Sequence, residues 1–199
     1  MSTNPTPVIQ ETAEIPEQDL LDVGIRVFDP GLENADAADK DNPVFPEVRK
    51  AESLYAVVAL SDTLQKSAGW GSVRVIPDAS SSVDVLVSGR LLESNGEYYA
   101  VEATVTDVTG KKWFTRRYEQ KASRYAYERG YRDPGDPGDV FQGVYNQIAN
   151  DMLEYRRKLD LSHIRLVRNV SELKFAGDFA PAAFAGHLVE DGGIYQVKR

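Results

Sequence analysis

Arginine and tyrosine side chains gather in one stretch of an otherwise acidic chain. These two residue types are the most enriched at binding hot spots. Tyrosine faces stack on sugar rings, and guanidinium groups hold carboxylates or phosphates through paired hydrogen bonds. The stretch therefore predicts a partner-binding surface for an acidic protein, an anionic lipid headgroup or a glycan. Alternatively, the tyrosines pack on a sheet edge and the arginines are solvated. The residues of the predicted surface are Arg116, Arg117, Tyr118, Arg124, Tyr125, Tyr127, Arg129, Tyr131 and Arg132.

No catalytic residue is predicted. The run Ser80–Ser82 lacks the Gly-x-Ser-x-Gly context of a serine nucleophile, and no phosphate-binding or dinucleotide fingerprint is present. Nothing in the pattern singles out either histidine, His163 or His187. The 31 acidic residues offer many carboxylate pairs, so abundance alone cannot identify a pair for hydrolysis. We expect a non-catalytic protein, and a hydrolase with acidic catalytic residues stays open as an alternative.

The composition predicts neither a metal nor a cofactor. Without cysteine, the chain has no disulfide, thiolate metal site or cysteine nucleophile. Asp133, Asp136 and Asp139 are separated by Pro-Gly pairs, whereas calcium loops place their ligands at alternating positions. These aspartates instead indicate a loop before a helix. The net charge of -8 repels a phosphate backbone, so nucleic-acid binding is not expected.

Two long helices are predicted, over residues 46–68 and 140–158. In the first, Val48, Ala51, Tyr55 and Val58 recur at helical spacing, which predicts an apolar face. The middle of this helix is apolar nearly all round, so we expect it to be well buried. Alternating apolar residues and turn signals, including an Asn-Gly hairpin turn, predict the strands. The strands cover residues 20–28, 72–76, 83–92, 98–107 and 112–120, the last three forming an antiparallel meander.

This order of elements predicts an α+β fold. We expect a mainly antiparallel sheet of about four to five strands, with the two helices packed on one face. Residues 1–19 hold three prolines and few large apolar groups, which is typical of a flexible leader. Residues 20–160 then form an α/β sandwich domain, and residues 161–199 a C-terminal extension that packs on or beside it. Within the extension we expect a short strand at 164–167, a short helix at 181–188 and a strand at 194–197.

The order of elements and the phrase from Val83 to Glu93, VDVLVSGRLLE, resemble the periplasmic auxiliary lipoproteins of envelope ABC transporters and related envelope assembly domains. The resemblance covers residues 20–159, and the last forty residues have no counterpart in it. It implies a non-catalytic domain that binds a protein partner in an envelope assembly or transport complex. It also implies a periplasmic location, with a tether to the outer membrane through an N-terminal lipid anchor.

The lipid-bearing cysteine of those lipoproteins is absent from this chain, and Met1 would stand in its place. Two other interpretations stay open: a small periplasmic hydrolase, and a cytoplasmic ligand-binding or adaptor module. The sequence predicts neither the identity of the partner nor the oligomeric state.

Overall fold

The α+β class is confirmed by the computed structural model, which describes residues 6–33, 45–77, 83–122, 139–184 and 186–198. Five strands form one sheet in the order β2-β1-β3-β4-β5. The first strand, β1, pairs in parallel with both β2 and β3. The predicted meander is confirmed as β3, β4 and β5, which pair antiparallel. The strands are β1 Val23–Arg26, β2 Val73–Ile76, β3 Val85–Ser94, β4 Tyr98–Asp107 and β5 Lys112–Lys121.

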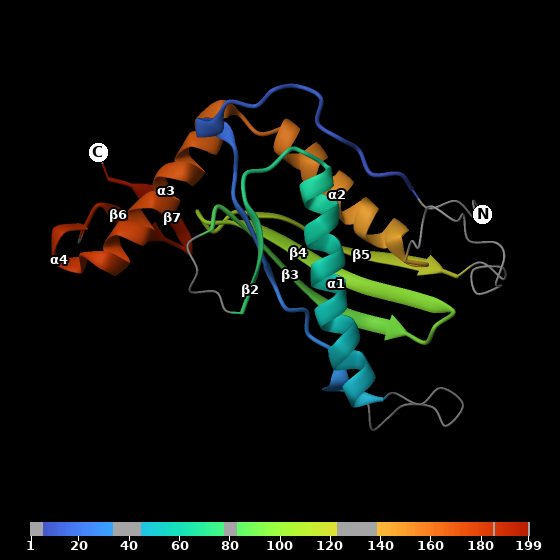
Figure 1. Ribbon diagram of the computed structural model, residues 1–199. Helices are drawn as coiled ribbons and strands as arrows, with labels where there is room; N and C mark the ends of the chain where they lie inside the picture. The colour runs from blue at the N-terminus through green and yellow to red at the C-terminus, as the bar shows by residue number, and fades with distance from the viewer. Residues whose placement is uncertain (1–5, 34–44, 78–82, 123–138, 185, 199) are drawn as a thin grey trace.

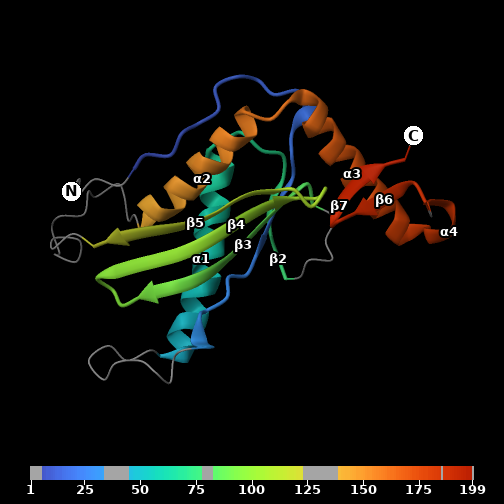
Figure 2. The ribbon, with the colours of Figure 1, turned by 180° about the vertical axis from the view of Figure 1, so that it is seen from behind.

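Helices α1, Pro46–Lys66, and α2, Gln142–Arg157, both lie on one face of the sheet, as predicted (Figure 1). Seen from behind, the opposite face carries no helix in the part of the chain that the structure describes (Figure 2). The core lies between the helices and the sheet, because alternate residues of each strand point to the helix face. Val87, Val101, Ile148 and Met152 are fully buried there.

The side of α1 that packs on the sheet is not the side that the sequence predicts. The residues that enter the core are Ala56, Val57, Leu60 and Leu64. The stripe that includes Val48, Tyr55 and Val58 faces outward, so the prediction that it is buried was wrong. This helix has apolar residues on two sides, and spacing alone does not decide which side meets the sheet.

The C-terminal extension begins with a long helix. Helix α3, Leu161–Phe179, replaces the strand predicted at 164–167. Ile164, Val167 and Val170 are buried at helical spacing, which a window of four residues is too short to reveal. A short helix α4, Pro181–Phe184, and a hairpin of β6, Leu188–Asp191, and β7, Ile194–Val197, follow it, which confirms the predicted terminal strand.

The predicted leader lies along α2 from residue 6 onward, as the blue trace above α2 in Figure 1 shows. The side chains of Asn146 and Asn150 bond its backbone, and the Ile9 N–H donates to Asn150 Oδ1 at 2.7 Å. Glu11 forms an ion pair of 2.9 Å with Arg157 at the end of α2. The Arg157 hydrogen bond, with further help from the Ala13 N–H, lowers the pKa of Glu11 to about 2. A short 3-10 turn, η1 Glu17–Asp19, then leads into β1.

Candidate functional site

Three aspartates lie at one end of the sheet. Asp22 and Asp84 directly precede β1 and β3, and Asp107 is the last residue of β4. Because β1 and β3 are parallel and β4 is antiparallel to β3, these three positions lie at the same end of the sheet. Asp84 N–H and Val85 N–H both donate to Asp22 O. Asp84 and Asp107 are only 1% and 3% exposed, so each carboxylate needs hydrogen-bond partners within the protein.

Asp107 is the centre of a buried polar network. Its Oδ1 accepts hydrogen bonds from the Thr109 N–H, at 3.0 Å, and from the Thr109 hydroxyl. Its Oδ2 accepts from Trp113 Nε1 at 3.0 Å and lies 2.8 Å from His163 Nε2. Asp107 therefore joins the end of β4, the β4–β5 turn, β5 and the first turn of α3.

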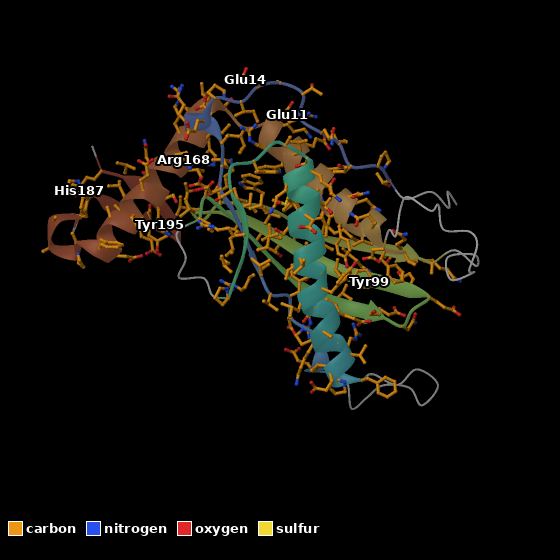
Figure 3. All side chains as sticks on the ribbon, viewed as in Figure 1. Glu11, Glu14, Tyr99, Arg168, His187 and Tyr195 are labelled. Atoms are coloured by element: carbon orange, nitrogen blue, oxygen red, sulfur yellow. The ribbon has the colours of Figure 1, made fainter. Side chains whose placement is uncertain are left out.

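Asp84 fixes the middle of α3. Its Oδ2 accepts from the Asp22 N–H at 2.8 Å and from Arg168 Nη1 at 3.0 Å. Arg168 Nη1 also lies 3.8 Å from Asp22 Oδ2, and the hydrogen bond to Asp84 raises the pKa of Arg168. Figure 3 shows Arg168 where α3 meets the strands. Helix α3 is thus held against the sheet by charged groups as well as by its apolar residues.

The C-terminal hairpin closes this end of the molecule. The Tyr195 N–H donates to Thr109 O at 2.7 Å, which joins β7 to the β4–β5 turn. Lys174 Nζ lies 3.6 Å from the centre of the Tyr195 ring and donates to Val108 O. Burial lowers the pKa of Lys174, while the Glu190 and Asp178 charges act in the opposite direction.

A cavity of about 600 Å³ opens between α3, the β4–β5 turn and β7. No sequence pattern singles out this region, because Asp107 and His163 are 56 residues apart and neither belongs to a known motif. The cavity is lined by polar, basic and apolar side chains: Thr109, Lys111, Ser162, His163, Arg165, Leu166, Asn169, Ile194, Tyr195, Gln196 and Val197.

Three of the nine residues of the predicted binding surface lie in described strand β5. Arg116 Nη1 and the Tyr118 hydroxyl both bond Asp151 Oδ2 on α2 at 2.7 Å, so these two side chains connect the sheet to that helix. Burial and the Asp151 contact raise the pKa of Tyr118, which is 5% exposed. Arg117 lies on the other face of the sheet and pairs with Glu119 at 2.9 Å. The other six lie outside the described residues: Arg124, Tyr125, Tyr127, Arg129, Tyr131 and Arg132.

The outer face of α1 is the other prominent surface. Five large apolar side chains, from the residue before this helix to its middle, are between 47% and 61% exposed. We call them the α1 stripe: Phe45, Val48, Leu54, Tyr55 and Val58. The spacing of this stripe is visible in the sequence, but its exposure is decided by which side of α1 meets the sheet.

The described residues hold neither a metal-binding cluster nor a membrane-spanning helix. No group of three or more histidine, aspartate and glutamate side chains in these residues is arranged to hold a metal ion. None of the helices in the described part of the chain combines the length and apolar character needed to cross a membrane.

No family model and no curated protein matches the chain. Among solved structures, it is similar to a PelC variant from Paraburkholderia phytofirmans that forms a dodecamer, with 14% identity and a TM-score of 0.44 over 73% of this chain and 92% of that one. It is also similar to a DUF330 protein from Xanthomonas campestris, with 12% identity and a TM-score of 0.41 over 75% of this chain and 90% of that one. Likeness at this level does not assign a function.

Proposed function

We propose that this chain is a non-catalytic protein-binding domain of the bacterial envelope that docks its partner on the α1 stripe. The observation that carries the proposal is the exposure of large apolar side chains along one side of a helix whose other side already fills the core. Val48, Leu54 and Tyr55 are each more than half exposed. Contiguous apolar surface of this kind marks interaction sites in soluble proteins.

The shape of the stripe favours a helical partner. The helical part of the stripe, from Pro46 to Val58, extends over about 20 Å at 1.5 Å per residue. Side chains spaced by three and four positions form a ridge that fits the groove of a second helix. We therefore expect the apolar side chains of the stripe to supply the main contact with the partner.

The contacts of His163 and Asp107 favour a structural role for this pair over a catalytic one. The Asp107 carboxylate is buried and accepts from Thr109 and Trp113 as well as facing His163. Such a network orders the end of the sheet and fixes α3 in place. A hydrolase using this pair is the second candidate, since His163 lines a cavity beside Ser162. Covalent labelling of Ser162 by a fluorophosphonate, abolished by His163→Ala, would favour that candidate.

The envelope location rests on the resemblance to periplasmic auxiliary lipoproteins, which implies a lipid anchor on the N-terminal side of the domain. In that setting the partner belongs to an assembly or transport complex. Fractionation of the native organism tests the location: we expect the protein with the outer membrane, and its recovery from the cytoplasm would contradict this part of the proposal.

Site-specific photo-crosslinking in the native cell tests the docking surface. A photoreactive phenylalanine replaces Tyr55 or Leu54 on the stripe, and replaces Thr104 on the open face of the sheet as the matched control. We expect adducts with one partner protein from the two stripe positions and none from Thr104. Adducts whose mass equals two copies of this chain, or equal adducts from all three positions, would refute a partner-specific stripe.

The arginine and tyrosine segment is tested in the same experiment. The variant with Arg124, Tyr125, Tyr127 and Arg129 all changed to alanine is crosslinked through position 55. A loss of the adduct at an unchanged melting temperature supports a second contact through this segment. An unchanged adduct would mean that the segment is not part of the binding surface and that the stripe alone contacts the partner.

A further inference from the structure

The cavity beside α3 has a basic wall in an acidic protein. Its volume of about 600 Å³ falls within the range of about 300–1,000 Å³ that is typical of small-molecule sites. Lys111 and Arg165 line it, and no aspartate or glutamate is among the described residues of its lining. In a chain with a net charge of -8, this local excess of positive charge favours an anionic ligand.

The basic side chains are not fully occupied by partners inside the protein. Arg165 is 55% exposed, and its Nε lies 3.5 Å from Asp19 Oδ1, which is a long contact for a charged pair. Lys111 is exposed in the β4–β5 turn. Both groups can therefore turn toward a ligand at little cost in existing contacts.

The first turn of α3 adds to the positive wall. Ser162 and His163 both line the cavity, and the Asp160 side chain makes no capping hydrogen bond at this helix end. The beginning of a helix carries partial positive charge and favours anions. The contact between Asp107 and His163 Nε2 fixes the orientation of the imidazole at this wall.

The remaining part of the lining is apolar. Leu166 comes from α3, while Ile194 and Val197 come from β7, so aliphatic residues belong to the same lining as the two basic residues. A simple inorganic anion would leave this apolar part in contact with water. A ligand with an anionic head and a short aliphatic tail would contact both parts.

We propose that this cavity binds a small amphipathic anion: a phosphate or carboxylate group carried on a short aliphatic chain. Lys111, Arg165 and the first turn of α3 hold the anionic head, and Leu166, Ile194 and Val197 contact the tail. The same head-group chemistry occurs in free phosphate monoesters and in anionic lipid headgroups. This site is separate from the α1 stripe, so the outcome of its test does not depend on the proposed function.

Isothermal titration of the full chain with three probes tests the chemistry. We expect hexyl phosphate to bind, inorganic phosphate to bind at least about 10-fold more weakly, and hexanol not to bind. The double variant Lys111→Ala/Arg165→Ala should weaken hexyl phosphate at least about 30-fold, since each charge-assisted hydrogen bond contributes about 10-fold or more. The matched control, Lys112→Ala on the neighbouring exposed lysine, should bind as the unchanged protein does.

A second variant tests the apolar wall without removing charge. Ile194→Ser should weaken hexyl phosphate several-fold and leave inorganic phosphate unchanged. Melting temperatures of all variants show whether the fold is kept, and Ile194→Ser decides the question if the double variant unfolds. Equal affinity of the unchanged protein and the double variant, equal affinity for hexyl and inorganic phosphate, or no binding of hexyl phosphate at about 1 mM would overturn the proposal.

Vesicles distinguish the two sources of the ligand. Retention on phosphatidic acid vesicles that is lost in the Lys111→Ala/Arg165→Ala variant supports a lipid headgroup as the ligand. Binding of hexyl phosphate without retention on these vesicles supports a free phosphate ester. Retention on neutral phosphatidylcholine vesicles that is unchanged in the variant would contradict recognition through the basic wall.

Discussion

Replacement of Asp107 by asparagine tests the buried polar network at the end of the sheet. The asparagine oxygen can still accept both bonds from Thr109. Its NH2 group, however, then faces the Trp113 Nε1–H, which is also a donor and is buried with its side chain at 6% exposure. An unsatisfied buried donor costs about 1–3 kcal/mol. His163 can change tautomer and accept from the new amide, so it loses only the charge assistance, about 0.5–1 kcal/mol.

These terms together predict that Asp107→Asn lowers the free energy of unfolding by about 1.5–4 kcal/mol. Urea unfolding followed by tryptophan fluorescence measures this, because Trp113 stacks on Tyr155 with ring centres 4.9 Å apart and reports on the core. With a denaturant slope of about 2 kcal/mol per molar urea, the midpoint should fall by about 1–2 M. Asp62→Asn on the exposed side of α1 is the control and should change the free energy by less than about 0.5 kcal/mol.

A double-mutant cycle separates the Trp113 bond from the other contacts of Asp107. Once Trp113→Phe has removed the indole N–H, and with unfolding followed by circular dichroism because the Trp113 reporter is gone, Asp107→Asn should cost at least about 1 kcal/mol less than it does alone. A midpoint shift below about 0.3 M for Asp107→Asn, or strictly additive effects in the cycle, would refute the role of this network in stability.

Two further changes test the leader and the C-terminal hairpin. Because the pKa of Glu11 falls from 4.5 to about 2 in the folded protein, its contribution is present above about pH 4.5 and is lost toward pH 2. The melting temperature of Glu11→Gln should therefore lie below that of the unchanged protein at pH 7. The gap should narrow below about pH 4.5 and close only toward pH 2. A constant gap, or the same behaviour in Glu14→Gln, would contradict the docked leader. Gly110 has a φ of +93°, and an added Cβ would collide with the backbone of the β6–β7 turn, so Gly110→Ala should speed hydrogen exchange at the Tyr195 N–H. Gly96→Ala, also at positive φ but with open space around the new methyl group, should leave that exchange unchanged.

The meander and the two long helices were predictable because their signals are local. Alternation and the Asn95-Gly96 turn set β3, β4 and β5, and Gly96 indeed adopts a positive φ of +81°. The parallel partners of β1 were not predictable, since β1 pairs with strands that are about 50 and 62 residues away in the chain. Such pairings depend on the whole packed core and leave no mark in a short window.

The candidate sites also divide into features that local sequence patterns predict and features that depend on packing between distant segments. The spacing of Val48, Tyr55 and Val58 indicated an apolar helix face, but α1 has apolar residues on two sides, and the packing of Ala56 and Leu60 decided which one is buried. The network around Asp107 joins residues from distant parts of the chain through burial, which composition does not reveal. Six of the nine arginine and tyrosine residues named from the sequence lie outside the described residues, so that surface stays a prediction.

The bound leader also decides how the domain responds to mechanical force. Its contacts follow α2 in order, from Asn146 through Asn150 to Arg157, as the leader runs from Thr6 to Glu11. A pull along the α2 axis loads these contacts together, in shear. A pull away from α2 breaks them one after another, as in unzipping. The domain would thus resist tension from its N-terminal side along one direction and release the leader along another.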